Sequence, residues 1–574
     1  MKNEMLDWMG RGAIGLLLAG LSVTAGCDDT ASTPATDAST VTDAPADTAD
    51  ATQPTDATQP TDVTQPTDAT QPTDATQPTD ATQPADASDA STAVARVRVV
   101  HAAPRAGNVD IFPAGSTTAA ASNVAYGSAT GYLSLPAGPV AFDIRAAGAT
   151  GAPAFTTPMI TLVGGRSYTV IAAGRLGSTD EADRFRVLAL AENFAADATN
   201  ARVRVVHAGA DAPTVGIDVG NDNPAAPEVA SLARFADTGE SGVSLPGDAA
   251  LQVGLTAGGA TVTAFTTPNL GAGNQWFVIA TGLLPSTDTS VNDGFGLLAV
   301  NQMGTTAFIK QNPRVHVVHA GADAPAVDLF AGPAGAGANP ARTLQIVDNL
   351  SYPARTGATT TGGIASVQVP PGSYGIDIFP YSAGSARPSG SPAFTVPTLA
   401  VEPGRQYVAI AAYFLAPQPA QTPPDSAFTV LPLRYEITND MTTATAPRIV
   451  AVHASGDAPS VDVGVLSGAT FTPLFTNVAR GATSPLAGTT APLDPFTVAI
   501  RAAGASTNAA TFSVDLDVNQ RVFVIAAGAL TPRAASGGGL ADQSFGLHAV
   551  FANPGTVQLG AGAWTLARIN PNAT

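Results

Sequence analysis

Apolar and polar residues alternate with a period of two through most of the chain after residue 94. This period puts apolar side chains on one face of a strand, and the longer period of an amphipathic helix is missing. The first part of this region therefore predicts strands at 95–101, 108–112, 131–135, 140–146, 159–163, 168–173 and 184–190. Gly, Pro, Asn and Ser separate these strands, as expected for turns. The spacing predicts an all-β fold, an immunoglobulin-like antiparallel sandwich of two sheets, with a closed barrel as the alternative.

The same pattern occurs four times along the chain. A segment ending in His recurs at 96–101, 202–207, 314–319 and 448–453, and a second apolar segment recurs at 168–174, 276–282, 407–413 and 523–528. The copies are separated by the length of a domain rather than by the shorter period of a solenoid. We predict four β-sandwich repeats at 94–197, 200–304, 312–438 and 446–554, each folding by itself, and a C-terminal tail at 555–574.

A glycine precedes the aromatic residue of the second segment by three positions. It is Gly165, Gly273 and Gly404 in the first three copies, and Gln520 takes its place in the last copy. This arrangement resembles the tyrosine corner of immunoglobulin-like folds, in which an aromatic side chain hydrogen-bonds back to the preceding turn.

Residues 1–26 have the pattern of an export signal. An apolar run at 13–23 is too short to span a bilayer and ends close to Ala25, Gly26 and Cys27. Small residues before a cysteine resemble the lipobox of bacterial lipoproteins, and Cys27 is the only cysteine of the chain. The resemblance implies that Cys27 is lipidated and anchors the chain to the cell envelope, at the outer membrane and cell surface or at the periplasmic face of the inner membrane. An ordinary signal peptide is the alternative.

Residues 27–93 predict a disordered stalk. They are rich in Thr, Pro, Asp, Gln and Ala, contain no aromatic residue, and include tandem hexapeptides of the form Thr-Gln-Pro-Thr-Asp-Ala between 52 and 87. A segment of this low complexity cannot bury enough apolar surface to offset the entropy lost on ordering. Regular prolines and like charges favour extended conformations, so we expect a spacer between membrane and sandwiches.

The net charge of −19 is concentrated in this stalk, where thirteen Asp lie between positions 28 and 89 without a Lys or Arg. The remainder of the chain is only mildly acidic and has no concentrated basic patch, which argues against nucleic acid as a partner. A single cysteine excludes intrachain disulfides and CxxC-based sites. Catalytic motifs such as Gly-x-Ser-x-Gly and HExxH are also missing, so we expect neither enzymatic activity nor a cofactor.

The recurring polar residues follow the pattern His-x3-Asp-x4-Asp. The histidines are His101, His207, His319 and His453, the first acids are Asp211, Asp323 and Asp457, and the second acids are Asp110, Asp328 and Asp462. Repeat 1 has Arg105 at the first acid position and repeat 2 has Gly216 at the second, so the set of metal ligands is incomplete there. If the Arg residues at 96 and 98 face solvent, His101 faces inward. We predict a buried histidine bonded to the next turn, and an Asx-turn at the first acid, rather than a metal site.

Repeat 3 is longer than the others, and its surplus residues predict longer loops. These loops contain Tyr352, Tyr381, Arg342, Arg355 and Arg387, and Tyr and Arg are the residues most enriched at binding hot spots. We therefore expect repeat 3 to carry the partner-binding loops if the protein has a specific partner. The alternative is that the longer loops are tolerated without a function, because closing them costs little entropy.

The residue pattern of the repeats resembles that of the domain of unknown function 4397 family. The closest correspondence is at 315–328 with the later segment 369–374, and at 203–218, and the resemblance extends over roughly 94–554. It implies export, tandem repeats and a β-rich fold, and it brings no known activity or site residues. The sequence thus predicts a non-enzymatic envelope lipoprotein that binds or adheres to an extracellular protein or polysaccharide. A purely structural spacer without a ligand is the alternative.

Overall fold

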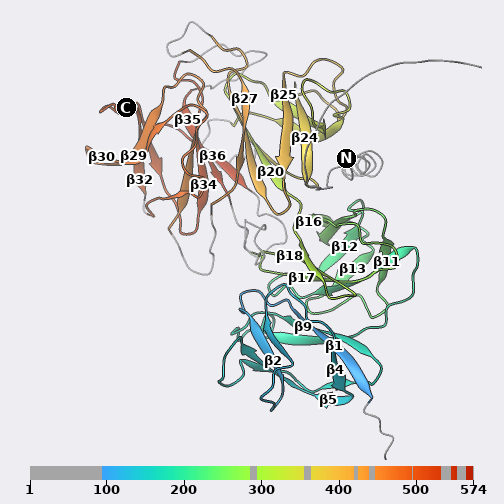
Figure 1. The fold of residues 1–574 in the computed structure, drawn as a ribbon. Coiled ribbons are helices and arrows are strands. Elements are labelled where there is room, and N and C mark those ends of the chain that lie inside the picture. Colours follow the sequence, from blue (N-terminus) through green and yellow to red (C-terminus); the bar gives the residue numbers. More distant parts are fainter. Residues whose placement is uncertain are drawn as a thin grey trace, which may run out of the picture. The chain divides into compact units, whose positions relative to one another are not determined.

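The computed structural model describes residues 93–284, 294–353, 363–418, 424–437, 446–493, 495–531, 544–552 and 564–572. Cys27, the predicted signal and stalk, and Arg355 lie outside these residues. All regular elements within the described ranges are β-strands (Figure 1). The described part of the chain accordingly has no helix with the length and hydropathy of a membrane span.

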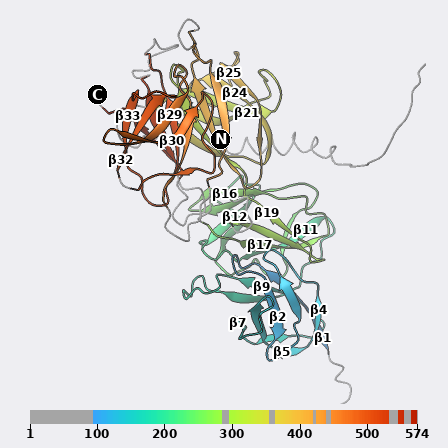
Figure 2. The ribbon, with the colours of Figure 1, turned by 60° about the vertical axis from the view of Figure 1, so that its left-hand side comes forward.

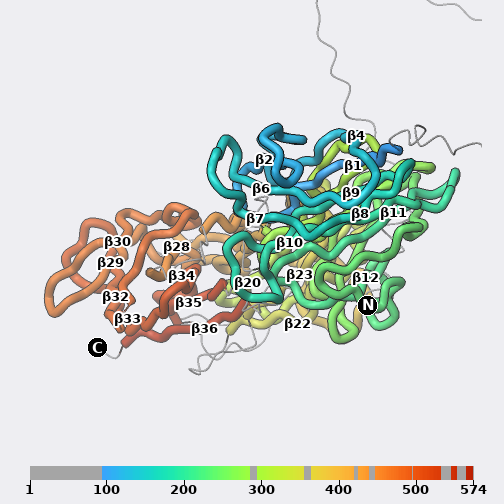
Figure 3. The backbone as a smooth tube through the Cα atoms, turned by 90° about the horizontal axis from the view of Figure 1, so that it is seen from below, coloured from blue at the N-terminus to red at the C-terminus, as the bar shows by residue number. Residues whose placement is uncertain are grey.

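Repeat 1 is a sandwich of two four-stranded sheets with the strand orders β10-β9-β1-β4 and β3-β2-β6-β7, beside a small pair, β5-β8 (Figure 3). All seven predicted strands are present, and β3, β5 and β7 are additional. These three have only two to four residues, too few for an alternating pattern to be recognised. The bounds are β1 (Val94–His101), β2 (Val109–Pro113), β3 (Ala121–Val124), β4 (Leu133–Pro136), β5 (Gly138–Val140), β6 (Phe142–Ala146), β7 (Phe155–Thr156), β8 (Ile160–Leu162), β9 (Ser167–Ala173) and β10 (Arg186–Ala191).

Repeat 2 has the same plan, with the sheet orders β14-β11-β17-β18-β19 and β13-β12-β15-β16. The bounds are β11 (Asn200–His207), β12 (Val215–Val219), β13 (Val229–Leu232), β14 (Val243–Pro246), β15 (Gln252–Ala257), β16 (Ala260–Thr266), β17 (Gln275–Thr281), β18 (Gly296–Asn301) and β19 (Thr306–Ile309).

Repeat 3 has the orders β23-β20-β26-β27 and β22-β21-β24-β25. The bounds are β20 (Arg314–Gly321), β21 (Val327–Pro333), β22 (Leu344–Leu350), β23 (Ile364–Gln368), β24 (Gly372–Pro380), β25 (Phe394–Val401), β26 (Gln406–Tyr413) and β27 (Thr429–Arg434).

Repeat 4 has the orders β31-β28-β34-β35-β36 and β30-β29-β32-β33, and the strands of the second sheet are seen together in Figure 2. The bounds are β28 (Arg448–His453), β29 (Val461–Ser467), β30 (Thr470–Val478), β31 (Thr489–Thr490), β32 (Phe496–Ala502), β33 (Ala510–Val514), β34 (Arg521–Ala527), β35 (Gly546–Phe551) and β36 (Thr565–Ile569). The four repeats confirm the prediction of tandem all-β sandwiches.

The sheet that contains the His-ending strand, here called the motif sheet, has one parallel strand pair in each repeat. β1 runs parallel to β9, and β11, β20 and β28 run parallel to β17, β26 and β34. The other pairs of named strands are antiparallel. A parallel pair joins strands that are distant in sequence, so the turn pattern that predicted antiparallel hairpins could not reveal it.

Repeats 2 and 4 extend beyond their predicted C-terminal limits. The four-residue strand β19 lies beyond residue 304 and pairs with β18, so it completes the motif sheet of repeat 2. Similarly, β36 lies within the predicted tail 555–574 and pairs with β35 of repeat 4. Among the described residues, the motif sheets of repeats 1 and 3 have no equivalent strand, so the similarity of the copies could not predict it.

The motif sheets of repeats 1 and 2 share one apolar core. Along β1, Val97 and Val99 face the inside of repeat 1, and Val100 on the opposite face packs in a cluster with Ile171, Val206 and Ile279. In the Val-Val pairs at 99–100, 205–206 and 317–318, the first Val packs inside its own repeat and the second packs in the core between two repeats. A repeat on its own would expose one apolar face of its motif sheet, which argues against the expectation that each repeat folds by itself.

Repeats 3 and 4 are joined in the same way. Val318 and Ile410 from repeat 3 cluster with Val452 and Ile525 from repeat 4, together with Trp564. The register of the parallel pairs places Val100, Val206, Val318 and Val452 at one equivalent position. Each pair is therefore built from the same face of both members, as in a two-fold symmetric dimer.

Candidate functional site

The four motif histidines are buried and bind backbone. The Nε2 atoms of His101, His207, His319 and His453 donate to the carbonyl oxygens of Gly107, Pro213, Pro325 and Pro459 at 2.8–2.9 Å. Each acceptor lies six residues after its histidine and holds the turn between the first two strands. Burial lowers the pKa of all four imidazoles, so they are neutral near pH 7. The predicted burial and hydrogen bond to the next turn are thus observed in all four repeats.

Of the two arginines expected to face solvent, only Arg96 is exposed. Arg98 does not face solvent, since it is 1% exposed and lies on the face covered by repeat 2. Its Nη1 donates to the carbonyl oxygen of Asn301 at 2.6 Å, and its Nε donates to Thr169 at 2.7 Å. The opposite face of β1 is thus an interface between repeats, which a pattern read within one repeat does not show.

The first acid of the motif connects two turns that are distant in sequence through hydrogen bonds to its carboxylate. Asp323 accepts from the backbone N–H groups of Leu415 and Ala416 at 2.6 and 2.8 Å, and Asp457 accepts from those of Leu530 and Thr531. Asp211 accepts from Leu284 in the same way. The carboxylate therefore caps the turn that follows β17, β26 or β34, and the local Asx-turn expected from the sequence does not describe these bonds.

The second acid fixes an irregularity of the other sheet. Asp110 accepts from the N–H groups of Asn123 and Gly148, and Asp328 and Asp462 make the same pair of bonds in repeats 3 and 4. Asn123 has φ 53°, and its strand pair shifts register at this point. Backbone N–H donors lower the pKa of Asp110 and Asp462 by stabilising the carboxylate.

No group of three or more His, Cys, Asp or Glu in the described residues could hold a metal ion. The bonds above explain why the motif does not form one. In repeats 3 and 4, which have both acids, the histidine and the two acids bond to different backbone segments, and their hydrogen-bonding capacity serves the fold.

Two of the candidate binding arginines are used inside repeat 3. Arg342 is 0% exposed, and its Nη1 lies 2.6 Å from Asp377, whose other oxygen accepts from Arg387 at 2.8 Å. Arg342 also donates to three carbonyl oxygens of its own loop, those of Pro333, Gly335 and Gly337. Burial alone would raise the pKa of Asp377, but the hydrogen bonds from both arginines outweigh it and hold the pKa below its usual range.

The expectation that these arginines are exposed loop anchors is therefore wrong. Tyr352 is also buried, with its ring 5.9 Å from that of His319 and 5.1 Å from that of His548 in repeat 4. Tyr381 is 44% exposed and is the one candidate of the described four that faces solvent. Loop length and residue type did not reveal the buried Asp377 that organises this segment, because the spacing of residues does not show it.

The aromatic corner is present in three repeats. The hydroxyl oxygens of Tyr168 and Tyr407 accept from backbone N–H groups five residues earlier at 3.0 Å, and the indole of Trp276 donates to Leu270 at 2.8 Å. In repeat 4 the strand register places Val522 at this position. The residue three positions earlier is Asn519, with φ 64°, and not Gln520 as the sequence comparison suggested.

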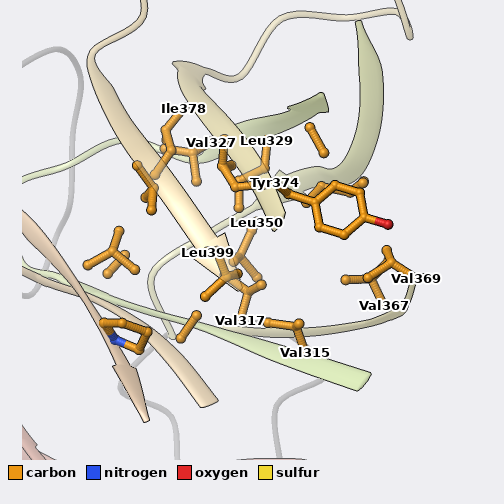
Figure 4. A pocket seen from close by; sticks show the side chains of 18 of the residues that line it. Val315, Val317, Val327, Leu329, Leu350, Val367, Val369, Tyr374, Ile378 and Leu399 are labelled. Atoms are coloured by element: carbon orange, nitrogen blue, oxygen red, sulfur yellow. The ribbon is translucent and has the colours of Figure 1, made fainter. Parts of the chain in front are cut away.

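Repeat 3 contains an internal cavity of about 60 Å³ between its two sheets. Figure 4 shows Val315 and Val317 from one sheet directed toward Val327, Leu329 and Leu350 from the other. Apart from His319, the lining residues are apolar or aromatic, so the cavity does not suit water. The register gives one cause of the cavity, because Ala409 occupies the position of Val170, Val278 and Val524 in the other repeats.

These features define a class of protein: tandem β-sandwiches paired through their motif sheets, with a recurring His/Asp motif that holds the fold. Residues 95–218 and 313–464 match the model of the Domain of unknown function (DUF4397), and these parts of the chain belong to that family. Each match begins at the first strand of an odd-numbered repeat and ends within β12 or β29 of the next one.

Other comparisons add no function. None of the curated proteins matches the chain. Among solved structures, the Bacillus anthracis TIE protein is similar over 74% of this chain and 68% of its own, with 10% identity and a TM-score of 0.12. A TM-score this low carries no argument about either fold or function.

Proposed function

We propose that the chain is a non-enzymatic envelope protein, lipid-anchored through Cys27, whose paired sandwiches form a structural spacer outside the cytoplasm. This role is supported by the hydrogen bonds of the recurring polar residues, which go to the protein's own backbone. His319, Asp323 and Asp328 all bond to backbone within their own repeat. A binding protein would be expected to direct recurring polar side chains toward a ligand.

The pairing of repeats supports the same proposal. A shared apolar core couples two sandwiches into one stiffer unit, which suits a protein that keeps a fixed distance or shape. A Pro-containing segment such as 27–93, if extended, adds reach at little energetic cost.

Binding or adhesion to an extracellular protein or polysaccharide is the second candidate. It is favoured by Tyr381, which is exposed on the segment following β24. Aromatic side chains on loops of a rigid scaffold are common anchors in interfaces.

One experiment separates the two roles. The full chain and its Tyr381→Ala variant are applied to a glycan array and to a pull-down from extracellular protein, with the exposed Leu493→Ala as a matched control. A spacer gives no saturable binding in any arm. Micromolar or tighter binding that Tyr381→Ala abolishes and Leu493→Ala preserves would establish the binding role and overturn the structural one.

A further inference from the structure

The interface between repeats 3 and 4 contains two histidines that are not part of the motif. His316 lies on β20 and His548 lies on β35, and both are 0% exposed. The strand register places His548 at the position of Leu188, Leu298 and Leu431 in the other repeats. A titratable ring thus replaces an aliphatic side chain at one of four equivalent positions.

The surroundings of His548 favour the neutral imidazole over the protonated one. Neither of its nitrogens has a hydrogen-bond partner among the described residues. The titratable groups facing it are Tyr352 after β22, whose ring is 5.1 Å away, His319 on β20 and Arg568 on β36. Arg568 stacks over Tyr352 at 5.4 Å and donates to the carbonyl of Ser544. None of these groups is negatively charged, so a protonated His548 has no counter-ion within the part of the chain that the structure describes.

His316 connects the same two repeats. Its Nδ1 lies 2.7 Å from Ser366 Oγ, and its Nε2 lies 3.1 Å from Gln406 Oε1. Its ring is stacked on the indole of Trp564 from repeat 4, with 3.6 Å between centroids and 10° between planes. The charged group next to it is Arg314, which disfavours a second positive charge.

We propose that the junction of repeats 3 and 4 is an acid-responsive contact, which protonation of His548 and His316 weakens while the junction of repeats 1 and 2 stays closed. A protonated His548 would lack an acceptor among the described residues for either N–H group. A protonated His316, although Ser366 and Gln406 can accept from it, would lie beside Arg314. Both charges are costly in an apolar interface. Separation of the two motif sheets hydrates His548 and His316 and removes the shared core that covers one face of each sheet, so backbone exchange in these sheets reports the separation. The histidines of the motif, in contrast, face the inside of their own repeats.

The direction of the effect follows from linkage. Burial lowers the pKa of both His548 and His316 to about 3, from an ordinary value of 6.5. A group whose pKa is lower in the closed state binds protons more readily in the open state. The contribution of these rings to the closed junction is complete above about pH 6.5 and is lost progressively as the pH falls toward 3.

Repeats 1 and 2 provide an internal control. Their equivalents of His548 are Leu188 and Leu298. Their equivalents of His316 are Arg98 and Arg204, which donate to backbone carbonyls across the junction. Each pair also has two motif histidines and two carboxylates whose pKa is lowered because hydrogen bonds stabilise the charged form. Burial also raises the pKa of Asp211 and Asp218 in repeat 2, which favours the folded state of repeats 1 and 2 as the pH falls. The effect of His548 is therefore isolated by the variant His548→Leu, which changes one ring within one pair.

The test is hydrogen exchange of the full chain, read by mass spectrometry between about pH 7 and pH 4. After correction for intrinsic rates, peptides covering β35 and β36 should lose protection at a higher pH than those covering β18 and β19. His548→Leu, which restores the residue of the other repeats, should lower that pH by about one unit, a tenfold change in exchange rate at fixed pH. The reciprocal variant Leu298→His should make repeats 1 and 2 acid-sensitive.

Loss of protection at the same pH in both pairs would overturn the proposal. So would a His548→Leu chain that loses protection at the same pH as the wild type. Because His548→Leu introduces an apolar residue into an apolar interface, it is expected to fold, and the conclusion does not depend on whether Leu298→His folds.

Discussion

Truncation of Phe277 tests whether repeats 1 and 2 share a core. Phe277 is 0% exposed and lies in the cluster between the two motif sheets, where its ring is 5.4 Å from that of Phe194. The guanidinium carbons of Arg98 and Arg204 lie 5.4 and 5.7 Å from its centroid. Truncating a buried Phe to Ala costs about 3–5 kcal/mol, and the lost aromatic and cation–π contacts place this site in the upper part of that range.

The expected shift follows from the size of the pair. For a unit of roughly 200 residues, 1 kcal/mol lowers the melting temperature by about 2–4 °C, so Phe277→Ala should lower it by about 10 °C or more. Hydrogen exchange in β9 and β10 of repeat 1 should accelerate by about three orders of magnitude for a loss of about 4 kcal/mol. The assay is calorimetry of the full chain combined with exchange resolved by repeat.

Phe512→Ala is the matched control, because Phe512 is also 0% exposed but lies inside repeat 4. This variant should leave the melting temperature of repeats 1 and 2 unchanged and lower the melting temperature of repeats 3 and 4. The reasoning is refuted if Phe277→Ala accelerates exchange in repeat 2 alone and leaves β9 and β10 as protected as in the wild type, since repeat 1 would then fold without its neighbour.

Three further variants test other parts of the molecule. Ala409→Val, which restores the residue of the other repeats, should fill part of the cavity in repeat 3 and stabilise repeats 3 and 4 by about 1 kcal/mol in thermal unfolding; destabilisation would show that the cavity cannot accept two methyl groups. His207→Ala should cost about 1–3 kcal/mol through the lost bond to Pro213, whereas EDTA should leave the wild-type melting temperature unchanged, and a large EDTA effect would instead indicate a bound metal. Cys27→Ser should abolish metabolic labelling with a palmitate analogue, and equal labelling of both chains would contradict lipidation.

The sequence predicted the sandwiches because their inner faces follow a period of two. Val97, Val99 and His101 stand on one face of β1, and the turn residues separate the strands clearly. The role of His101 also followed from this pattern, since a histidine at the end of an inward row needs a nearby acceptor, and Gly107 provides it.

The relations between repeats could not be predicted in the same way. Arg98 is charged and was expected to face solvent, but a partner repeat supplies the carbonyl of Asn301 and makes burial tolerable. Likewise, Asp377 neutralises Arg342 and Arg387 from another strand, so residues typical of binding surfaces became internal. The place of His548 could not be predicted because it lies outside the recurring motif, and only the strand register shows that it replaces a leucine.

Pairing through equivalent faces has a consequence for how such a chain gains or loses length. Duplication of a single repeat would leave one apolar motif face, bearing the equivalents of Val100 and Ile171, without a cover. Exposed apolar patches of this kind promote association or aggregation. Duplication of two neighbouring repeats leaves no such face. The unit that evolution can add or delete at low risk is therefore the pair, and we expect working arrays built on this plan to contain even numbers of repeats.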